Sequence, residues 1–191
     1  MSHGIDTAPA LPGIDPDTPA LLQPLARLLL LVNRAMVELG MLALLSASCV
    51  LTYSVISRYV MKASTDWQDE TAVFCLVGAT FMSGAFVQSL RGHVGIEAVS
   101  TLLPAAVNRL RQVGVDLMCA LFCGFFAWKS WTLWHEAWTE GQTTSSSWAP
   151  PLWIPYGLMA AGMTLLTLQI AVQLSASVNA LRNRRDRKTQ P

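Results

Sequence analysis

The sequence carries unusually little charge for its length. Of 191 residues only 13% are Asp, Glu, Lys or Arg, whereas 52% are hydrophobic and the mean hydropathy is +0.40. A soluble domain has about a quarter of its residues charged, so roughly half of the usual charge is missing. This composition does not suit an aqueous globular domain and predicts a protein that places apolar surface in a membrane.

Cysteine and histidine are also scarce, and their positions exclude several kinds of site. The residues are Cys49, Cys75, Cys119, Cys123, His3, His93 and His135. All four cysteines fall within long apolar runs, which argues against a disulfide framework, and the histidines lie in tails and loops, where none can ligate a haem inside the membrane. No phosphate loop, dinucleotide fingerprint, metalloprotease motif or nucleophile elbow occurs. We therefore predict no cofactor, no metal, no enzyme activity and no nucleic-acid partner.

The first 24 residues lack both the basic start and the uninterrupted apolar run of a signal peptide. They contain Asp6, Asp15 and Asp17, five prolines and no Lys or Arg. Such a segment can neither propagate a helix nor bury a core, so residues 1–24 are predicted to be a disordered cytoplasmic tail. Residues 183–191 are predicted to be a second, basic cytoplasmic tail.

Four apolar segments of about 20 residues remain, the length that crosses ~30 Å of hydrocarbon. They cover about 35–56, 71–90, 113–134 and 156–178. A helical lead-in with Arg27 and Arg34 precedes the first segment and is predicted to lie near the membrane surface, with its arginines among the headgroups. The fold class is therefore predicted to be an all-α integral membrane protein, with a four-helix membrane domain over residues 25–182.

An amphipathic pattern separates the second and third spans. Ile96, Val99, Leu103, Val107 and Leu110 recur at steps of three and four, with polar residues between them. This predicts an interfacial arm helix over about 94–111, interrupted at the proline in position 104. The arm is too polar to span the membrane, and two interpretations remain open: a linker lying in the headgroups, or a brace that holds a larger membrane partner.

The distribution of basic residues predicts the orientation. Ten of the 13 Lys and Arg residues fall in the N-terminal region, the second loop and the C-terminal tail, and three fall on the other side. The side richer in Lys and Arg normally faces the cytoplasm. We therefore predict a multi-pass protein of the bacterial inner membrane with both termini in the cytoplasm.

Three charged residues stand inside or close to the spans, and their positions argue against a mid-membrane ion relay. Glu38, Asp116 and Lys129 each lie within a turn or two of a predicted interface. Glu38 is expected to pair with Arg34, to sit at a water-exposed end or to contact a partner helix, and Asp116 has Arg109 nearby. Lys129 is expected to snorkel past a tryptophan stripe at the headgroup level. The stripe consists of Trp128, Trp131, Trp134 and Trp138.

Short motifs flank the predicted spans in a characteristic order. They are Arg58-Tyr59, Trp67 with Asp69-Glu70, Gly92-His93-Val94-x-Ile96, a helix started by Pro104, Glu140-Gly141-Gln142 and Pro151-Leu152-Trp153-Ile154-Pro155. Over residues 25–182 this ordered set resembles the small membrane (DctQ-type) subunit of the tripartite ATP-independent periplasmic (TRAP) transporters. Two positions depart from the family pattern: Asp69 replaces the first of two glutamates, and Gly95 stands where a basic residue is common.

The resemblance implies a small permease subunit that scaffolds a large polytopic permease during sodium-coupled uptake of an organic acid. A periplasmic substrate-binding protein would deliver the substrate transiently, and membrane lipid would surround both permease subunits. The resemblance points to Arg58, Trp67, Asp69, Glu70 and His93 as partner-interface or structural residues. Arg58 is expected to pair with Asp69 or Glu70 or to reach a partner, Trp67 to anchor at the headgroup boundary, and His93 to begin the cytoplasmic arm.

Two other functions are compatible with four membrane helices that carry no catalytic motif and no mid-membrane ion relay. One is a non-transport membrane anchor or assembly subunit. The other is a small self-contained exporter acting as a homodimer, which would need a carboxylate deep in the membrane. Glu38 is the only candidate for that carboxylate.

Overall fold

The protein is all-helical over the residues that the computed structural model describes, which are 18–62, 66–90 and 105–188. Its main elements are α1 (Gln23–Ile56), a π-helical turn (Ser57–Met61), α2 (Asp66–Ser89), α4 (Ala105–Thr139) and α5 (Trp153–Lys188), with a short 3-10 helix (Ala20–Leu22) before α1. Four helices are long and apolar enough to cross a membrane. The predicted fold class is thereby confirmed.

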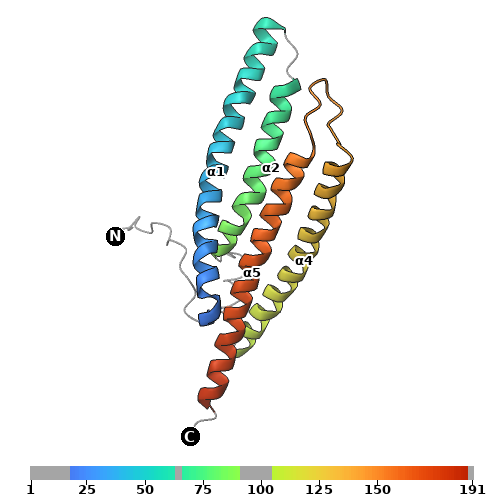
Figure 1. The fold of residues 1–191 in the computed structure, drawn as a ribbon. Coiled ribbons are helices and arrows are strands. Elements are labelled where there is room, and N and C mark those ends of the chain that lie inside the picture. Colours follow the sequence, from blue (N-terminus) through green and yellow to red (C-terminus); the bar gives the residue numbers. More distant parts are fainter. Residues whose placement is uncertain (1–17, 63–65, 91–104, 189–191) are drawn as a thin grey trace, which may run out of the picture.

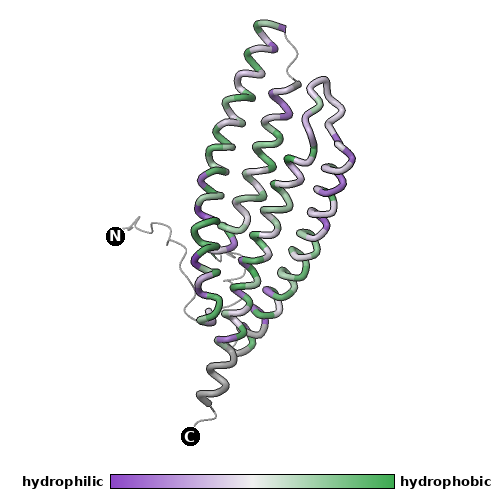
Figure 2. Tube along the Cα trace, viewed as in Figure 1, coloured by the Kyte–Doolittle hydropathy of each residue, from purple (hydrophilic) through white to green (hydrophobic). Residues whose placement is uncertain are grey.

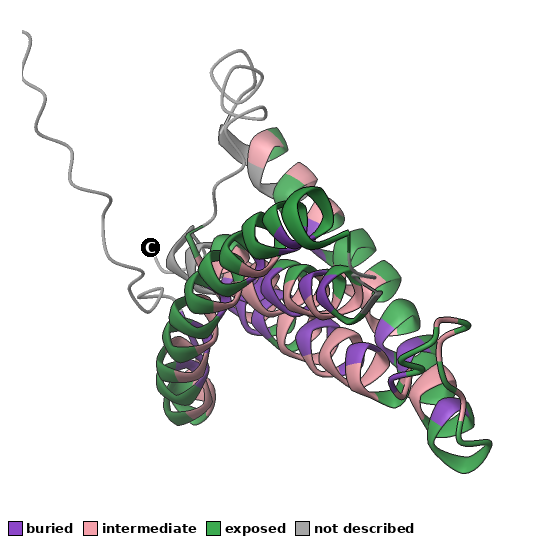
Figure 3. Cartoon of the chain, turned by 90° about the horizontal axis from the view of Figure 1, so that it is seen from above, coloured by how far each residue is buried: buried purple, intermediate pink, exposed green. Residues whose placement is uncertain are grey.

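The four long helices form an open row. α1 packs against α2, α2 against α5, and α5 against α4, as Figure 1 shows from left to right. Helix α1 begins and α5 ends at the same end of the molecule, while the end of α1, the start of α2 and the α4–α5 loop lie at the opposite end (Figure 1). Seen from above, buried residues gather where helices face each other and the outer faces of the helices are largely exposed (Figure 3). A row of this kind leaves two broad faces for lipid or for another protein.

Helix α1 is longer than the first predicted span. It has 34 residues, about 51 Å at 1.5 Å per residue, and Pro24 stands in its first turn. The lead-in that carries Arg27 and Arg34 is therefore the first part of a single continuous helix rather than a separate surface segment. Figure 2 shows hydrophilic residues well inside the length of α1.

Helix α4 likewise extends beyond its predicted span. It begins at Ala105, directly after Pro104, and continues for 35 residues to Thr139. Residues 105–111 of the predicted arm are thus continuous with the third membrane helix, and the expected boundary at about residue 112 does not exist. The rest of the arm, including the segment that begins with His93, lies outside the described residues.

Small residues make the contacts between neighbouring helices. A Cβ atom added to Gly40 on α1 would lie 3.5 Å from the Cα of Ala79 on α2. A Cβ atom added to Gly162 on α5 would overlap the backbone carbonyl of Phe81 on α2, with only 2.6 Å to its carbon. Most buried apolar side chains are alanines, whereas large ones such as Phe122, 62% exposed, face outward. This arrangement is typical of membrane helices, for which lipid tails are the outer solvent.

Loop clamps and polar contacts between the helices

The first loop is closed by a contact between two of the family-like motifs. Arg58 on the π-helical turn donates through Nη2 to Oδ2 of Asp69 in the first turn of α2, at 3.0 Å. The other carboxylate oxygen of Asp69 accepts a hydrogen bond of 3.2 Å from the hydroxyl of Ser54, which is buried on α1. Both oxygens of Asp69 therefore hold α1 and α2 together at this end. We call the set Ser54, Arg58 and Asp69 the first loop clamp. Of the two expected partners of Arg58, the structure places Asp69 in this bond.

Two acceptors beside this ion pair, Oε1 of Gln68 and Oε2 of Glu70, are buried without a hydrogen-bond partner among the residues that the structure describes. Trp67, the residue before Gln68, leaves 46% of its surface exposed. Buried acceptors are normally hydrogen-bonded. His93, the fifth candidate, lies outside the described residues.

The α4–α5 loop is closed by the two remaining described motifs. Gly141 adopts a left-handed backbone conformation with φ of 62° just after the end of α4. Glycine reaches this conformation without strain, which explains its place at the helix end. The carbonyl of Gln142 then accepts a 2.9 Å bond from the N–H of Leu152, and Trp153 packs on Trp138 with ring centroids 5.0 Å apart. We call the contacts between Gln142 and Leu152 and between Trp138 and Trp153 the second loop clamp. The four described motifs thus form two pairs, one in each clamp, and both clamps lie at the same end of the row.

The tryptophan stripe has a packing role in addition to its predicted place at the headgroup level. The Nε1 of Trp131 donates to the hydroxyl of Thr164 on α5 at 3.0 Å, and Trp134 covers Gly157 on α5. Lys129 extends over the exposed ring of Trp128, with Nζ 5.1 Å from its centroid. The stripe therefore joins α4 to α5 on one side and contacts the surroundings on the other.

A polar layer inside the row connects α1, α2 and α5. Asn33 is fully buried, and its Nδ2 donates to Oε1 of Gln169 at 3.1 Å and to the carbonyl of Ala85 at 3.5 Å. About one turn further along α5, Gln88 and Gln173 are joined by two hydrogen bonds, of 2.8 and 2.9 Å. Sequence reasoning missed this layer, although amide side chains within apolar spans were the signal. Within the described residues, Oδ1 of Asn33 is buried without a hydrogen-bond partner. These neutral amides join the helices and offer no ionised ligand to a substrate.

Asp116 on α4 is buried and accepts a 3.3 Å hydrogen bond from the hydroxyl of Ser177 on α5. The expected partner on its own helix, Arg109, has a side chain outside the described part. Glu38 does meet one of its expected partners, because Oε1 lies 3.4 Å from Nε of Arg34, and both side chains are exposed.

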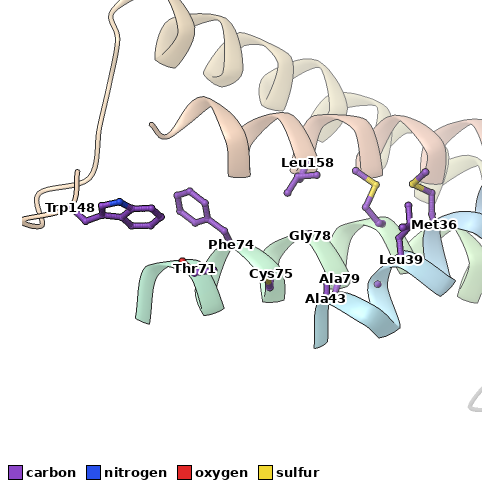
Figure 4. Close-up of a pocket in the computed structure, with 12 residues that line it drawn as sticks. Met36, Leu39, Ala43, Thr71, Phe74, Cys75, Gly78, Ala79, Trp148 and Leu158 are labelled. Carbon is purple, nitrogen blue, oxygen red and sulfur yellow. The ribbon is translucent and has the colours of Figure 1, made fainter. Parts of the chain in front are cut away.

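An apolar hollow of about 520 Å³ lies between α1, α2 and the start of α5 (Figure 4). Phe74 on α2 and Trp148 from the α4–α5 loop close one end, Met36 and Leu39 on α1 line the other, and Leu158 contributes from α5. Its lining is almost entirely hydrocarbon, so it offers nothing that would hold an ionised substrate. The described residues also contain no group of three His, Cys, Asp or Glu side chains placed to hold a metal.

The fold and these contacts define a multi-pass membrane protein whose buried polar groups join its own helices and loops. A family model described as the DctQ component of the tripartite ATP-independent periplasmic transporters matches residues 47–180. The chain belongs to this family, which confirms the resemblance seen in the loop motifs and makes the protein a transporter component rather than a member of an enzyme family. Comparisons with curated proteins and with solved structures found no match.

Proposed function

We propose that this chain is the small permease subunit of a TRAP-type secondary transporter and serves as a fixed scaffold for the large permease subunit. The match to the DctQ component across residues 47–180 is the observation that carries the proposal. In this proposal the large subunit carries the sodium and substrate sites, a periplasmic binding protein delivers an organic acid, and the small subunit performs no catalysis.

The distribution of polar groups supports a scaffolding role. In the described part of the chain, the buried amides bond one another, and Asp69 and Asp116 bond residues on neighbouring helices. A transport site would instead present unpaired ionisable groups to a water-filled path through the membrane. The long helices and the two loop clamps suit an element that keeps its shape while a partner moves.

The orientation and the interface residues belong to the same proposal. Both termini face the cytoplasm of a bacterial inner membrane in this proposal. The reason is that the start of α1, the start of α4 and the end of α5, which are rich in Lys and Arg, lie at the same end of the row. The loop clamps then face the periplasm, where Arg58, Trp67, Asp69 and Glu70 shape the surface beside the partner. His93 begins the cytoplasmic segment between α2 and α4.

Purification with mild detergent tests the proposal. The tagged chain is expressed from its native locus, and the proteins recovered with it are identified by mass spectrometry. We expect one large polytopic permease in about equal amount. Recovery of the folded chain alone, or as its own dimer, would refute the proposal and return attention to the anchor and exporter alternatives.

A further inference from the structure

An exposed stripe along α1 differs in composition from the rest of that helix's outer surface. It consists of Arg34, Glu38, Met41, Leu45, Ser48 and Thr52, which recur at alternating steps of four and three residues and are all exposed. Four of these six side chains are charged or carry a hydroxyl. The other exposed positions of α1 over the same length are Ala35, Leu39, Leu42, Leu44, Ser46, Cys49 and Leu51, among which Ser46 has the only hydroxyl.

The charged end of this stripe lies level with the apolar part of α2. Asn33 is level with Ala85, and Gly40 is level with Ala79, so Glu38 lies level with Thr80 and Phe81 on α2. These two residues are at the centre of the uncharged 20-residue stretch of α2, from position 71 to 90. Arg34 lies about one turn further toward the cytoplasmic end. Glu38 is thus level with the middle of the apolar part of α2, although it stands at the beginning of the predicted first span.

Helix α5 gives the same depth independently. Its membrane-length segment is Trp153–Ala180, and its centre lies between Leu166 and Thr167. Gln169, less than one turn from that centre, bonds Asn33, the residue directly before Arg34. Two neighbouring helices thus place the Arg34–Glu38 pair level with the middle of their own apolar segments.

Lipid is a poor neighbour for a pair at this depth. The side chains of Arg34 and Glu38 are 66% and 59% exposed, and one contact of 3.4 Å joins them. Within the described residues no other hydrogen bond to either side chain is found, so most of their hydrogen-bonding capacity is unused. Ionisable residues inside a membrane almost always face protein or water instead of lipid.

We infer that the stripe Arg34–Glu38–Met41–Leu45–Ser48–Thr52 is a docking seam for a transmembrane helix of the large permease subunit, which presents polar groups to Arg34 and Glu38. Steps of four and three residues are the spacing with which helices pack along a left-handed seam. Ser48 and Thr52 further along the stripe are small, so a second helix can approach closely there. Their hydroxyls already donate to backbone carbonyls of α1, at 3.0 and 2.8 Å, and need no partner on that second helix.

Charge complementarity favours this occupant over a second copy of the chain. A parallel copy packed on the same seam would set Glu38 against Glu38 and Arg34 against Arg34 at equal depth, and like charges in contact oppose association. A different helix can offer an acceptor to the arginine and a donor to the glutamate. The identity of that helix's owner rests on the function proposed above.

The test compares matched variants in the complex purified from the native locus. Ser48→Leu enlarges a residue on the seam, and Ser46→Leu makes the same change two residues away on a different side of α1. We expect Ser48→Leu to lower the recovery of the large permease by about fivefold or more, because overpacking weakens a fitted contact. Ser46→Leu is expected to leave recovery unchanged. Equal effects of the two variants would overturn the inference.

Removing the charge pair shows whether Arg34 and Glu38 contact the permease or lipid. If the two side chains face lipid and bond only each other, the double variant Arg34→Leu with Glu38→Leu retains or increases permease recovery. If the pair faces the permease, the double variant loses it. A wild-type preparation without any permease would instead contradict the proposed function, so the two failures are distinguishable.

Photo-crosslinking tests the seam even if the double variant fails to fold. The full chain carries p-benzoylphenylalanine in place of the exposed Leu45 on the seam or, as the control, at position 46. An adduct with the large permease from position 45 and none from position 46 is the expected result. An adduct between two copies of this chain from position 45, or permease adducts from both positions, would overturn the inference.

Discussion

The contact between α2 and α5 makes a sharp prediction at Gly162. The Cβ atom of an alanine there would overlap the backbone of Phe81, with 2.6 Å to the carbonyl carbon. Ordinary contacts between carbon atoms are about 3.5–4.0 Å, so one helix has to move by roughly 1 Å. The obstacle is backbone and not the flexible end of a side chain, so a change of rotamer cannot relieve it.

The magnitude follows from two opposing terms. Alanine is favoured over glycine inside a helix by about 1 kcal/mol, whereas overpacking a fitted contact costs about 1–3 kcal/mol. The displacement also separates the helices around Ala160 and Met163, which are both buried on α5. We expect Gly162→Ala to lower the free energy of unfolding by up to about 2 kcal/mol, the difference between the two terms.

Reversible unfolding in mixed micelles, followed by circular dichroism, measures this difference. Gly114 on α4 supplies the control, because a Cβ atom added there meets nothing within 4 Å. Gly114→Ala should therefore show the helix-propensity gain alone, up to about 1 kcal/mol of added stability. If Gly162→Ala were as stable as Gly114→Ala, the close approach of α2 and α5 would be wrong.

Three further substitutions test the polar contacts by the same unfolding measurement. Asn33→Leu keeps most of the volume but leaves Oε1 of Gln169 without its donor. We expect a loss of about 0.6 kcal/mol, the average for hydrogen bonds between membrane helices, and at most about 1.7 kcal/mol; no loss would contradict the buried layer. Trp131→Phe removes the 3.0 Å bond to α5 and should destabilise by about 1 kcal/mol, more than the same change at the exposed Trp128, and equal effects would argue against a packing role for the stripe. Asp69→Ala should cost about 1 kcal/mol, mostly from the buried serine hydroxyl that loses its acceptor, because an exposed ion pair contributes little; a loss above about 3 kcal/mol would mean that the clamp is more buried than described.

The sequence predicted the existence of the four membrane helices better than it predicted their ends. Uncharged runs of about 20 residues identify a span because charge is expensive in hydrocarbon. They do not identify where a helix stops. Nothing between Leu25 and Ile56 breaks a helix except the tolerated Gly40, so α1 continues through Arg27 and Arg34.

Contacts between helices were the part that hydropathy could not supply. The bond between Asn33 and Gln169 joins residues 136 positions apart, and only the order of helices in the row brings them together. The level of Glu38 relative to α2 and α5 could not be predicted for the same reason, since it depends on the register of α1 against those helices. The loop motifs, in contrast, were recognisable individually, but their pairing into two clamps required the three-dimensional arrangement.

An open row has a consequence for how this protein holds its shape. Lipid tails are as apolar as leucine, so association of membrane helices depends on close packing and on polar contacts rather than on the hydrophobic effect. The buried alanines and amides provide such contacts along the row, but α1 and α4 each have a neighbour mainly on one side. The outer face of α4 is apolar around Met118 and Phe122 and suits lipid, whereas the outer face of α1 carries the exposed Arg34–Glu38 ion pair. The two edges of the row are therefore not equivalent, and the docking seam that we infer for the large permease lies on the α1 edge.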